Sequence, residues 1–295
     1  MTQMPTVWRL KTKPKVSDDA RAQFIQAMLE EDFIATGWEL PDEPTSIKSC
    51  LELLKKTYPG RGGATPQRFV KDTRIGDLVW IVDTKKGVFH LAQIRGDYYY
   101  KRMDGESGPE AVHRFNVDWV KCGLAPQDVP GGVKNALRVG STYCRIRNEA
   151  SRIYSAKLAG IVLPFGATTD FIALLDDQAL EDLVGLYLQH KLNGPLIPST
   201  CKSDTAAIEF VVRSWDGTRA AVVQVKSGQQ RISDTLKGWS QERFLFAASG
   251  GYPPHLDGAE IIDRNLLINF AWEYKCLLPN TVTCWMDEVH SAKAA

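Results

Sequence analysis

Clustered cysteine and histidine side chains are absent from this sequence of 295 residues. No CxxC pair and no Cys/His spacing typical of a zinc finger occurs. The composition therefore excludes a zinc ribbon and favours free thiols in a reducing cytosol. The cysteines are scattered over the chain: Cys50, Cys122, Cys144, Cys201, Cys276 and Cys284.

Long apolar runs and a strong charge of one sign are also absent. No run approaches the roughly 18 apolar residues of a membrane span, and the first ten residues lack the apolar core of a secretory signal. We therefore expect a cytoplasmic protein with no membrane partner. The net charge of +1 excludes a strongly basic nucleic-acid coat, but a local basic cleft remains possible.

The length predicts about two domains, each with its own core. The segment Pro126 to Gly132, rich in proline and glycine, is the clearest candidate linker. We expect a recognition domain over 1–125, a linker with a connector helix over 126–165, and a second domain over 166–295. The fold class expected is α+β or α/β.

The first domain is predicted to contain a small β-barrel with helices. Alternating apolar and aromatic segments read as strands, and helical patterns cover 22–30 and 46–57. The glycine-rich stretch 58–66 does not match a phosphate-binding loop and is predicted to be an irregular loop. The expected barrel strands cover 77–82, 88–94, 98–100 and 113–120.

A hairpin is predicted in the second domain, where two β-rich runs flank Asp216 and Gly217. This turn sets Glu209 opposite Gln224, with Lys226 as the diagonal neighbour, at separations of about 5 and 7–8 Å. A carboxylate and an amide oxygen are hard ligands suited to Mg²⁺, and a nearby ammonium stabilises charge on phosphate. The alternative is an exposed edge hairpin with an ordinary polar trio.

Glu209 followed by Gln224-Val225-Lys226 resembles the catalytic core of the PD-(D/E)xK nuclease superfamily, in its Mrr-like branch with a Q-x-K variant. The order of the neighbouring segments agrees. Residues 178–190 resemble the first helix of that family, 243–250 its next strand and 259–270 its closing strand and helix. The resemblance implies a restriction-endonuclease-like α/β domain with a central mixed sheet.

The resemblance also implies a role for each residue. Glu209, Gln224 and Glu181 would hold Mg²⁺, and Lys226 would activate water or stabilise the transition state. Asp182 is the reserve for Glu181, and Asp204 is a rival ligand or a plain turn residue. The family more often has Asp at the position of Glu209, and Gln224 offers only a neutral oxygen. The implied substrate is double-stranded DNA, most simply cut by a homodimer.

Aromatic residues of the first domain resemble those of EVE/PUA-like domains, in the order Gly37-Trp38, 75–80, 94–100 and 113–119. That family recognises modified or flipped bases. The resemblance nominates Trp38, Tyr98, Tyr100 and Trp119 as pocket residues. Stacking of bases on aromatic rings supports this assignment, although aromatic residues on barrel strands also fill cores.

Two functions remain open from the sequence. The first is a Mg²⁺-dependent endonuclease acting in modification-dependent restriction or anti-phage defence. The second is a reader that binds modified nucleic acid or a nucleotide ligand and keeps a degenerate nuclease fold as its scaffold.

Overall fold

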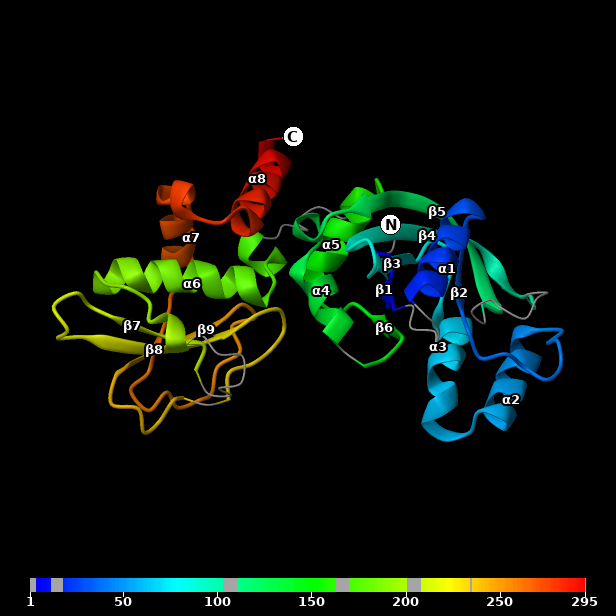
Figure 1. Cartoon of the computed structure of the whole chain (residues 1–295), viewed down its shortest axis with the longest axis horizontal. Coiled ribbons are helices and arrows are strands. Elements are labelled where there is room, and N and C mark those ends of the chain that lie inside the picture. Colours follow the sequence, from blue (N-terminus) through cyan, green and yellow to red (C-terminus); the bar gives the residue numbers. More distant parts are fainter. Residues whose placement is uncertain are drawn as a thin grey trace. The chain divides into compact units, whose positions relative to one another are not determined.

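The structure is a computed structural model, and it describes residues 4–11, 18–102, 111–138, 140–162, 170–200, 208–233 and 235–294. The chain forms two compact units (Figure 1). Unit 1 contains 1–129 and 136–167, and unit 2 contains 130–135 and 168–295. No helix in the described ranges has the length and apolar character needed to cross a bilayer.

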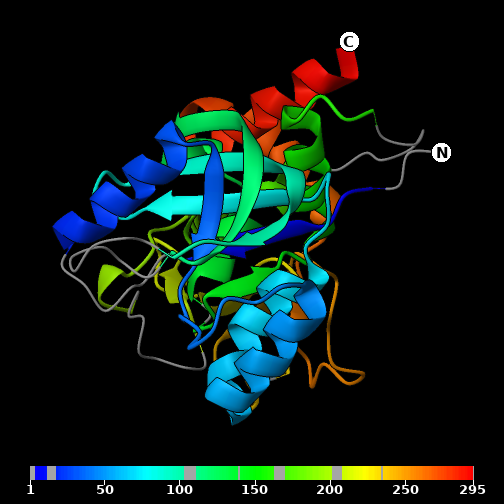
Figure 2. The same ribbon diagram turned by 90° about the vertical axis from the view of Figure 1, so that its right-hand side faces the viewer.

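Unit 1 is built on a curled sheet that forms a half-barrel (Figure 2). Its strand order is β2-β5-β4-β3-β1-β6, so β2 and β6 stand at opposite edges in the described residues. The predicted small barrel is thus observed as an open half-barrel. The strands are β1 (Val7–Leu10), β2 (Phe33–Thr36), β3 (Leu78–Asp83), β4 (Val88–Tyr100), β5 (His113–Leu124) and β6 (Tyr143–Arg145).

Two helices of unit 1 agree with the sequence patterns, and a third was not predicted. Helices α1 (Asp18–Glu30) and α2 (Ile47–Thr57) cover the expected windows. The stretch predicted as a loop instead contains a 3₁₀ turn at Gly60–Gly63 and the start of α3 (Ala64–Asp72). Proline is tolerated in a first helical turn because the amide hydrogens there have no partner within the helix, so Pro66 does not stop α3.

The segment 126–165, predicted as a linker with a connector helix, is instead built largely into unit 1. Strand β6 pairs antiparallel with β1. Helix α5 (Glu149–Leu158) is joined to the sheet by a hydrogen bond. The indole N–H of Trp80 on β3 donates to the Ser155 hydroxyl at 2.8 Å. A strand of three residues is too short to show an alternation of apolar and polar side chains, so the sequence pattern did not predict β6. Helix α4 (Gly131–Arg138) precedes β6.

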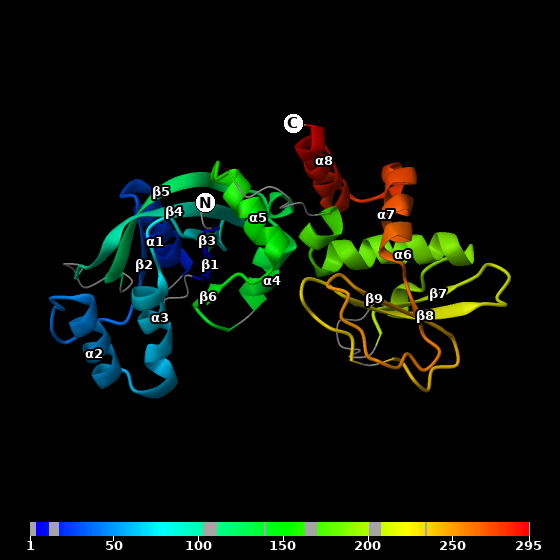
Figure 3. The ribbon, with the colours of Figure 1, turned by 180° about the vertical axis from the view of Figure 1, so that it is seen from behind.

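Unit 2 contains a mixed four-stranded sheet in the order β10-β9-β8-β7. The pair β7–β8 is antiparallel, and β8–β9 and β9–β10 are parallel. Helix α6 (Asp177–Leu192) runs along the sheet and contacts β7 and β8 (Figure 3). The remaining elements are β7 (Phe210–Arg213), β8 (Ala220–Lys226), β9 (Glu242–Ala247), β10 (Glu260–Ile261), α7 (Arg264–Glu273) and α8 (Asn280–Ala294).

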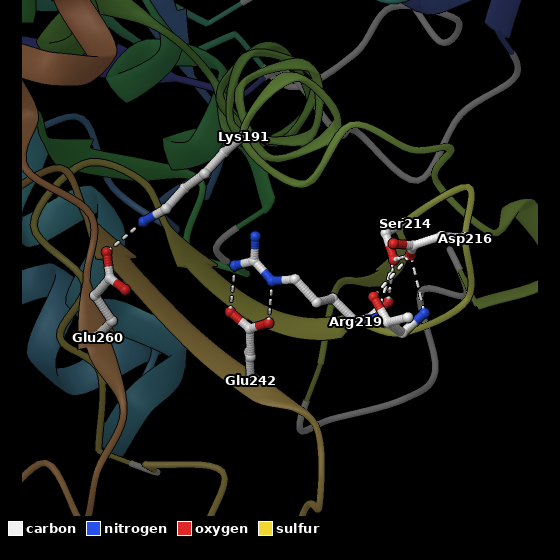
Figure 4. A network of polar contacts seen from close by, with 7 residues as sticks. Lys191, Ser214, Asp216, Arg219, Glu242 and Glu260 are labelled. Atoms are coloured by element: carbon white, nitrogen blue, oxygen red, sulfur yellow. Dashed lines mark hydrogen bonds and ion pairs between the residues drawn. The ribbon is translucent and has the colours of Figure 1, made fainter.

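The β7–β8 hairpin has the register predicted from its Asp-Gly turn. The pairs run from Phe210–Val223 to Arg213–Ala220, as predicted, but they do not extend to Glu209, which was expected opposite Gln224. In the turn, the Asp216 carboxylate accepts hydrogen bonds from the Ser214 and Thr218 hydroxyls (Figure 4). These bonds lower the pKa of Asp216 to about 2, so it stays ionised and holds the turn at neutral pH.

Candidate functional site

A polar cavity of about 180 Å³ opens in unit 2 where the first turns of α6 meet the end of β8. The N-terminal turns of α6 supply Asp177 and, one turn later, Glu181. Glu209 comes from the start of the hairpin and Lys226 from the last position of β8. The lining residues are Asp177, Glu181, Glu209, Val225, Lys226, Ser227 and Gln230.

Glu209 and Lys226 form an ion pair in this cavity. The Lys226 Nζ donates to Glu209 Oε1 at 2.9 Å, and the two side chains are 26% and 21% exposed. The amide N–H of Glu209 donates to the Val223 carbonyl oxygen at 2.9 Å. Val223 is also the partner of Phe210, so the regular register ends before Glu209, as at a β-bulge. The hairpin therefore fixes both backbones and brings the carboxylate to the ammonium.

Glu181 lies in an environment that disfavours its charged form. Burial raises its pKa to about 7, and the negative charges of Glu209 and Asp177 add to this effect. Lys226 acts in the opposite direction but does not cancel it. Negative charge is thus only partly compensated in the cavity, and Glu181 changes protonation near neutral pH.

Asp177 and Ser227 are cavity residues that the sequence analysis missed. The Ser227 hydroxyl donates to Asp177 Oδ1, and the Asn135 amide nitrogen donates to the same oxygen at 3.0 Å and to the Ser227 Oγ at 2.9 Å. The neighbouring Asp176 caps α6 by accepting from the Ala179 N–H. Two consecutive aspartates at a helix start read as capping residues, so the pattern alone gave no sign that Asp177 faces a cavity.

The first residue of α4 lies against the backbone that leads into α6. A methyl group at Gly131 would lie 2.1 Å from the Leu175 carbonyl oxygen. We expect Gly131→Ala to destabilise unit 2 by about 1–3 kcal/mol, because backbone must move to accept it. Urea unfolding measures this loss. The control is Gly140→Ala, where the added methyl has nothing within 4 Å. Equal stabilities of the two variants would contradict the prediction.

Gln224 does not line the cavity, although the sequence pattern predicted it there beside Glu209. It is 5% exposed. Val222 and Leu245, which share its face of the sheet, pack against residues that follow β8 in the chain. Both faces of β8 are therefore covered. The covering residues are Ile232, Leu236 and Ala259, with Tyr252 and Leu256 partly buried beside them.

The two reserve carboxylates lie elsewhere. Asp182 accepts a hydrogen bond from Gln178 at 3.1 Å and is not part of the cavity lining. Asp204 lies outside the described residues. Of the acidic residues nominated from sequence, the structure brings Glu181 and Glu209 together with Lys226.

The cavity offers carboxylate oxygens, which suit a hard divalent cation, but it does not surround an ion with protein ligands. Among the residues that the structure describes, no group of three or more His, Cys, Asp or Glu is placed to share one ion. Mg²⁺ keeps several waters and binds through one or two carboxylates together with substrate phosphate. Glu181 and Glu209, with their partly compensated charge, meet that requirement.

Three of the four aromatic residues nominated for base recognition lie around His113 in unit 1. The Tyr98 ring stacks on the imidazole at 6.0 Å between centroids, and the Tyr100 ring meets it edge-on at 5.3 Å. The Trp38 carbonyl oxygen lies 3.0 Å from His113 Nε2. Tyr100 is buried, and its hydroxyl accepts from the Leu40 N–H, whereas Trp38 and Tyr98 are partly exposed.

His113 is held neutral by its surroundings. Burial lowers its pKa to about 4, against the opposing effect of the Trp38 carbonyl. That carbonyl can only accept, so His113 Nε2 carries the proton and Nδ1 accepts from the Tyr98 hydroxyl at 2.9 Å. The Tyr98 oxygen in turn lies 3.2 Å from the thiol of Cys50 on α2. This chain of hydrogen bonds fixes the orientation of the Tyr98 ring.

Trp119 lies apart from this aromatic group. It pairs with Ala92 on β4, while Tyr98 pairs with Phe115. Its ring meets that of His90 edge-on at 6.0 Å. Trp119 Nε1 and His90 Nε2 are buried without a hydrogen-bond partner in the described part of the chain. The structure therefore does not place all four nominated aromatic residues in one pocket.

Comparisons with known proteins add little to this geometry. The sequence matches no curated protein. Protein Atu2648 from Agrobacterium tumefaciens is similar to 54% of this chain over 96% of its own length, at 12% identity and a TM-score of 0.26, which is too low to support a common fold. Residues 12–135 match a family described as a domain of unknown function (DUF8426).

Proposed function

We propose that this chain is a metal-dependent DNA endonuclease that acts on modified DNA, as in restriction or anti-phage defence. The observation that carries the proposal is the Glu209–Lys226 pair, at 2.9 Å, in a cavity that also holds Glu181. Carboxylates beside a lysine match the requirements of phosphodiester hydrolysis, which needs a cation site, a proton acceptor and a positive charge near the phosphate.

Each cavity residue has a chemical task in this proposal. Glu209 and Glu181 would hold Mg²⁺, which when bound polarises phosphate and makes water more acidic. Lys226 donates hydrogen bonds to a phosphate oxygen and offsets the charge that builds up during in-line attack. In the metal-free protein the pKa of Glu181 is raised to about 7, and a bound cation would favour its ionised form. Gln224, in its buried position, supports the strand rather than the ion.

Selection of modified DNA is assigned to unit 1. Trp38 and Tyr98 are partly exposed, and the buried His113 orients the Tyr98 ring, so these two aromatic side chains are the candidates for stacking on a base. Stacking on aromatic rings contributes about 1–3 kcal/mol per base. One cavity per chain cuts one strand, so cleavage of both strands most simply involves a homodimer.

A second candidate function is a reader that binds modified nucleic acid or a nucleotide ligand without cutting. The position of Gln224 favours it, because this residue is buried and does not line the cavity. In that case the second unit serves as a scaffold, and the cavity retains no turnover.

Cleavage of matched plasmids tests the proposal. We expect the wild-type protein with Mg²⁺ to cut plasmid carrying modified cytosine, to spare unmodified plasmid, and to lose activity in EDTA or after Glu209→Ala. Plasmids that stay intact while the protein still shifts modified DNA would favour the reader. Cutting that persists in Glu209→Ala would overturn the assigned site.

A further inference from the structure

The helical hairpin formed by α2 and α3 carries a local excess of positive charge. Residues 46–76 contain seven basic and two acidic residues, an excess of five positive charges in a chain whose net charge is only +1. The two helices pack against each other beside the half-barrel (Figure 2). The basic residues are Lys48, Lys55, Lys56, Arg61, Arg68, Lys71 and Arg74.

The cations on each helix share the face that points away from the core. At about 100° per residue, Lys48, Lys55 and Lys56 fall within roughly one quadrant of α2, across the helix from buried Cys50 and Leu54. All three lysines are exposed. The same spacing applies to α3. Its exposed Arg68 and Lys71 lie on the side of the helix opposite the buried Pro66 and Val70.

The lysines of this surface outnumber the carboxylates near them, although Glu52 lies on the same face of α2, one turn from Lys48 and Lys56. Within the described ranges, no acidic group forms an ion pair with Lys48, Lys55, Lys56 or Lys71. Elsewhere in unit 1, by contrast, Arg95 pairs with Asp118 at 3.0 Å. A local excess of exposed cations is the electrostatic footprint of a polyanion site.

Helix α2 also contacts the aromatic group of unit 1. The thiol of Cys50 lies 3.2 Å from the Tyr98 hydroxyl, and the Tyr58 hydroxyl, just past α2, donates to the Glu39 carbonyl oxygen at 2.6 Å. Residue 39 directly follows Trp38. The charged face and the aromatic residues are therefore carried by elements that hold each other in place.

We propose that the exposed cations of α2 and α3 bind the phosphate backbone of double-stranded DNA. The choice of DNA as the polyanion rests on the proposed function. Backbone contacts supply most of the sequence-independent affinity and fix the register of the duplex, while a base is read elsewhere. A membrane surface is less suitable, because the exposed large apolar residues of this segment are only Ile47 and Ile75 among those described, too few for an interfacial helix.

The test is the salt dependence of binding to a fluorescein-labelled DNA duplex, measured by anisotropy in EDTA so that no cleavage is required. We expect the triple variant K48Q/K55Q/K56Q to lower the slope of log K against log salt by about 2–3, because each phosphate contact contributes about 0.9. Its affinity should fall most at the lowest salt.

The matched control is K85Q/K86Q/K121Q, which removes three exposed cations from other elements of unit 1. We expect it to leave the slope unchanged, and the arginine variant K48R/K55R/K56R to retain the wild-type slope. Equal slopes for K48Q/K55Q/K56Q and the wild-type protein would overturn the proposal. So would equal losses in the two glutamine triples, or binding to duplex RNA or phosphatidylserine vesicles but not to DNA. These measurements need no catalytic turnover. A protein that binds DNA through this surface but does not cut it would refute the proposed endonuclease and still support the proposed binding surface.

Discussion

Lys226→Ala is expected to slow DNA cleavage at least about 100-fold while leaving DNA affinity nearly unchanged. The reason is that a preorganised charge aimed at the transition state typically contributes this much to the rate, and much less to ground-state binding. Lys226 is the cation paired with Glu209 in the cavity. Single-turnover cleavage, with binding measured separately in EDTA, resolves the two effects.

Lys191→Ala is the matched control for this change. Lys191 also pairs with a glutamate, Glu260, but at the surface, where α6 passes β10 (Figure 4). Its loss should leave the cleavage rate within about threefold of the wild-type protein, since surface pairs contribute little. A Lys226→Ala protein that cuts at the wild-type rate would refute the mechanism. Equal losses in both variants would indicate a general effect on folding.

The part of the site that the sequence predicted well is the part set by local rules. An Asp-Gly turn fixes the register of a two-stranded hairpin, and a register fixes which side chains lie opposite each other. Those rules bring Glu209 close to Lys226, and the two side chains do meet, although the regular register ends at Phe210. The same alternation places Tyr98 and Tyr100 on one face of β4, where both rings meet His113.

The remaining parts depend on contacts between distant segments. Gln224 is polar and was therefore expected in the site, but residues eight or more positions later in the chain cover its face of the sheet. Asp177 and Asn135 meet across 42 positions in the sequence. The sequence around each residue does not predict this contact, because a hydrogen bond between distant segments produces no periodic pattern of residues.

Helix α3 and strand β6 were also missed because they depend on tertiary contacts rather than on local sequence. Helix α3 begins within a stretch of glycine and proline, and its stability comes from Phe69 and Val70, which are buried in the core of unit 1. Strand β6 exists because the edge of β1 offers it hydrogen bonds. In both cases tertiary packing overrides a weak local preference.

Glu181→Gln is expected to stabilise the metal-free protein at pH 8 while reducing cleavage strongly. The folded-state pKa of Glu181 is raised from 4.5 to about 7, so between these values the folded protein binds more protons than the unfolded chain. The contribution of this carboxyl to stability therefore falls as the pH rises from 4.5 to about 7, and the full penalty is present above 7. An amide carries no charge, so the variant should lack this penalty. Allowing for solvent screening of a partly exposed group, we expect a gain of about 1–2 kcal/mol.

Thermal melting in EDTA at pH 5 and pH 8 measures this difference. The gain should be present at pH 8 and small at pH 5, where Glu181 is already protonated in the folded protein. Asp182→Asn removes the smallest of the charges that raise the pKa of Glu181 and does not line the cavity, so it should give a much smaller change than Glu181→Gln. With Mg²⁺ present the order should reverse, because a cation bound by Glu181 and Glu209 stabilises only a protein that keeps both carboxylates. A Glu181→Gln protein that gains the same stability from Mg²⁺ as the wild-type protein would show that Glu181 does not hold the ion.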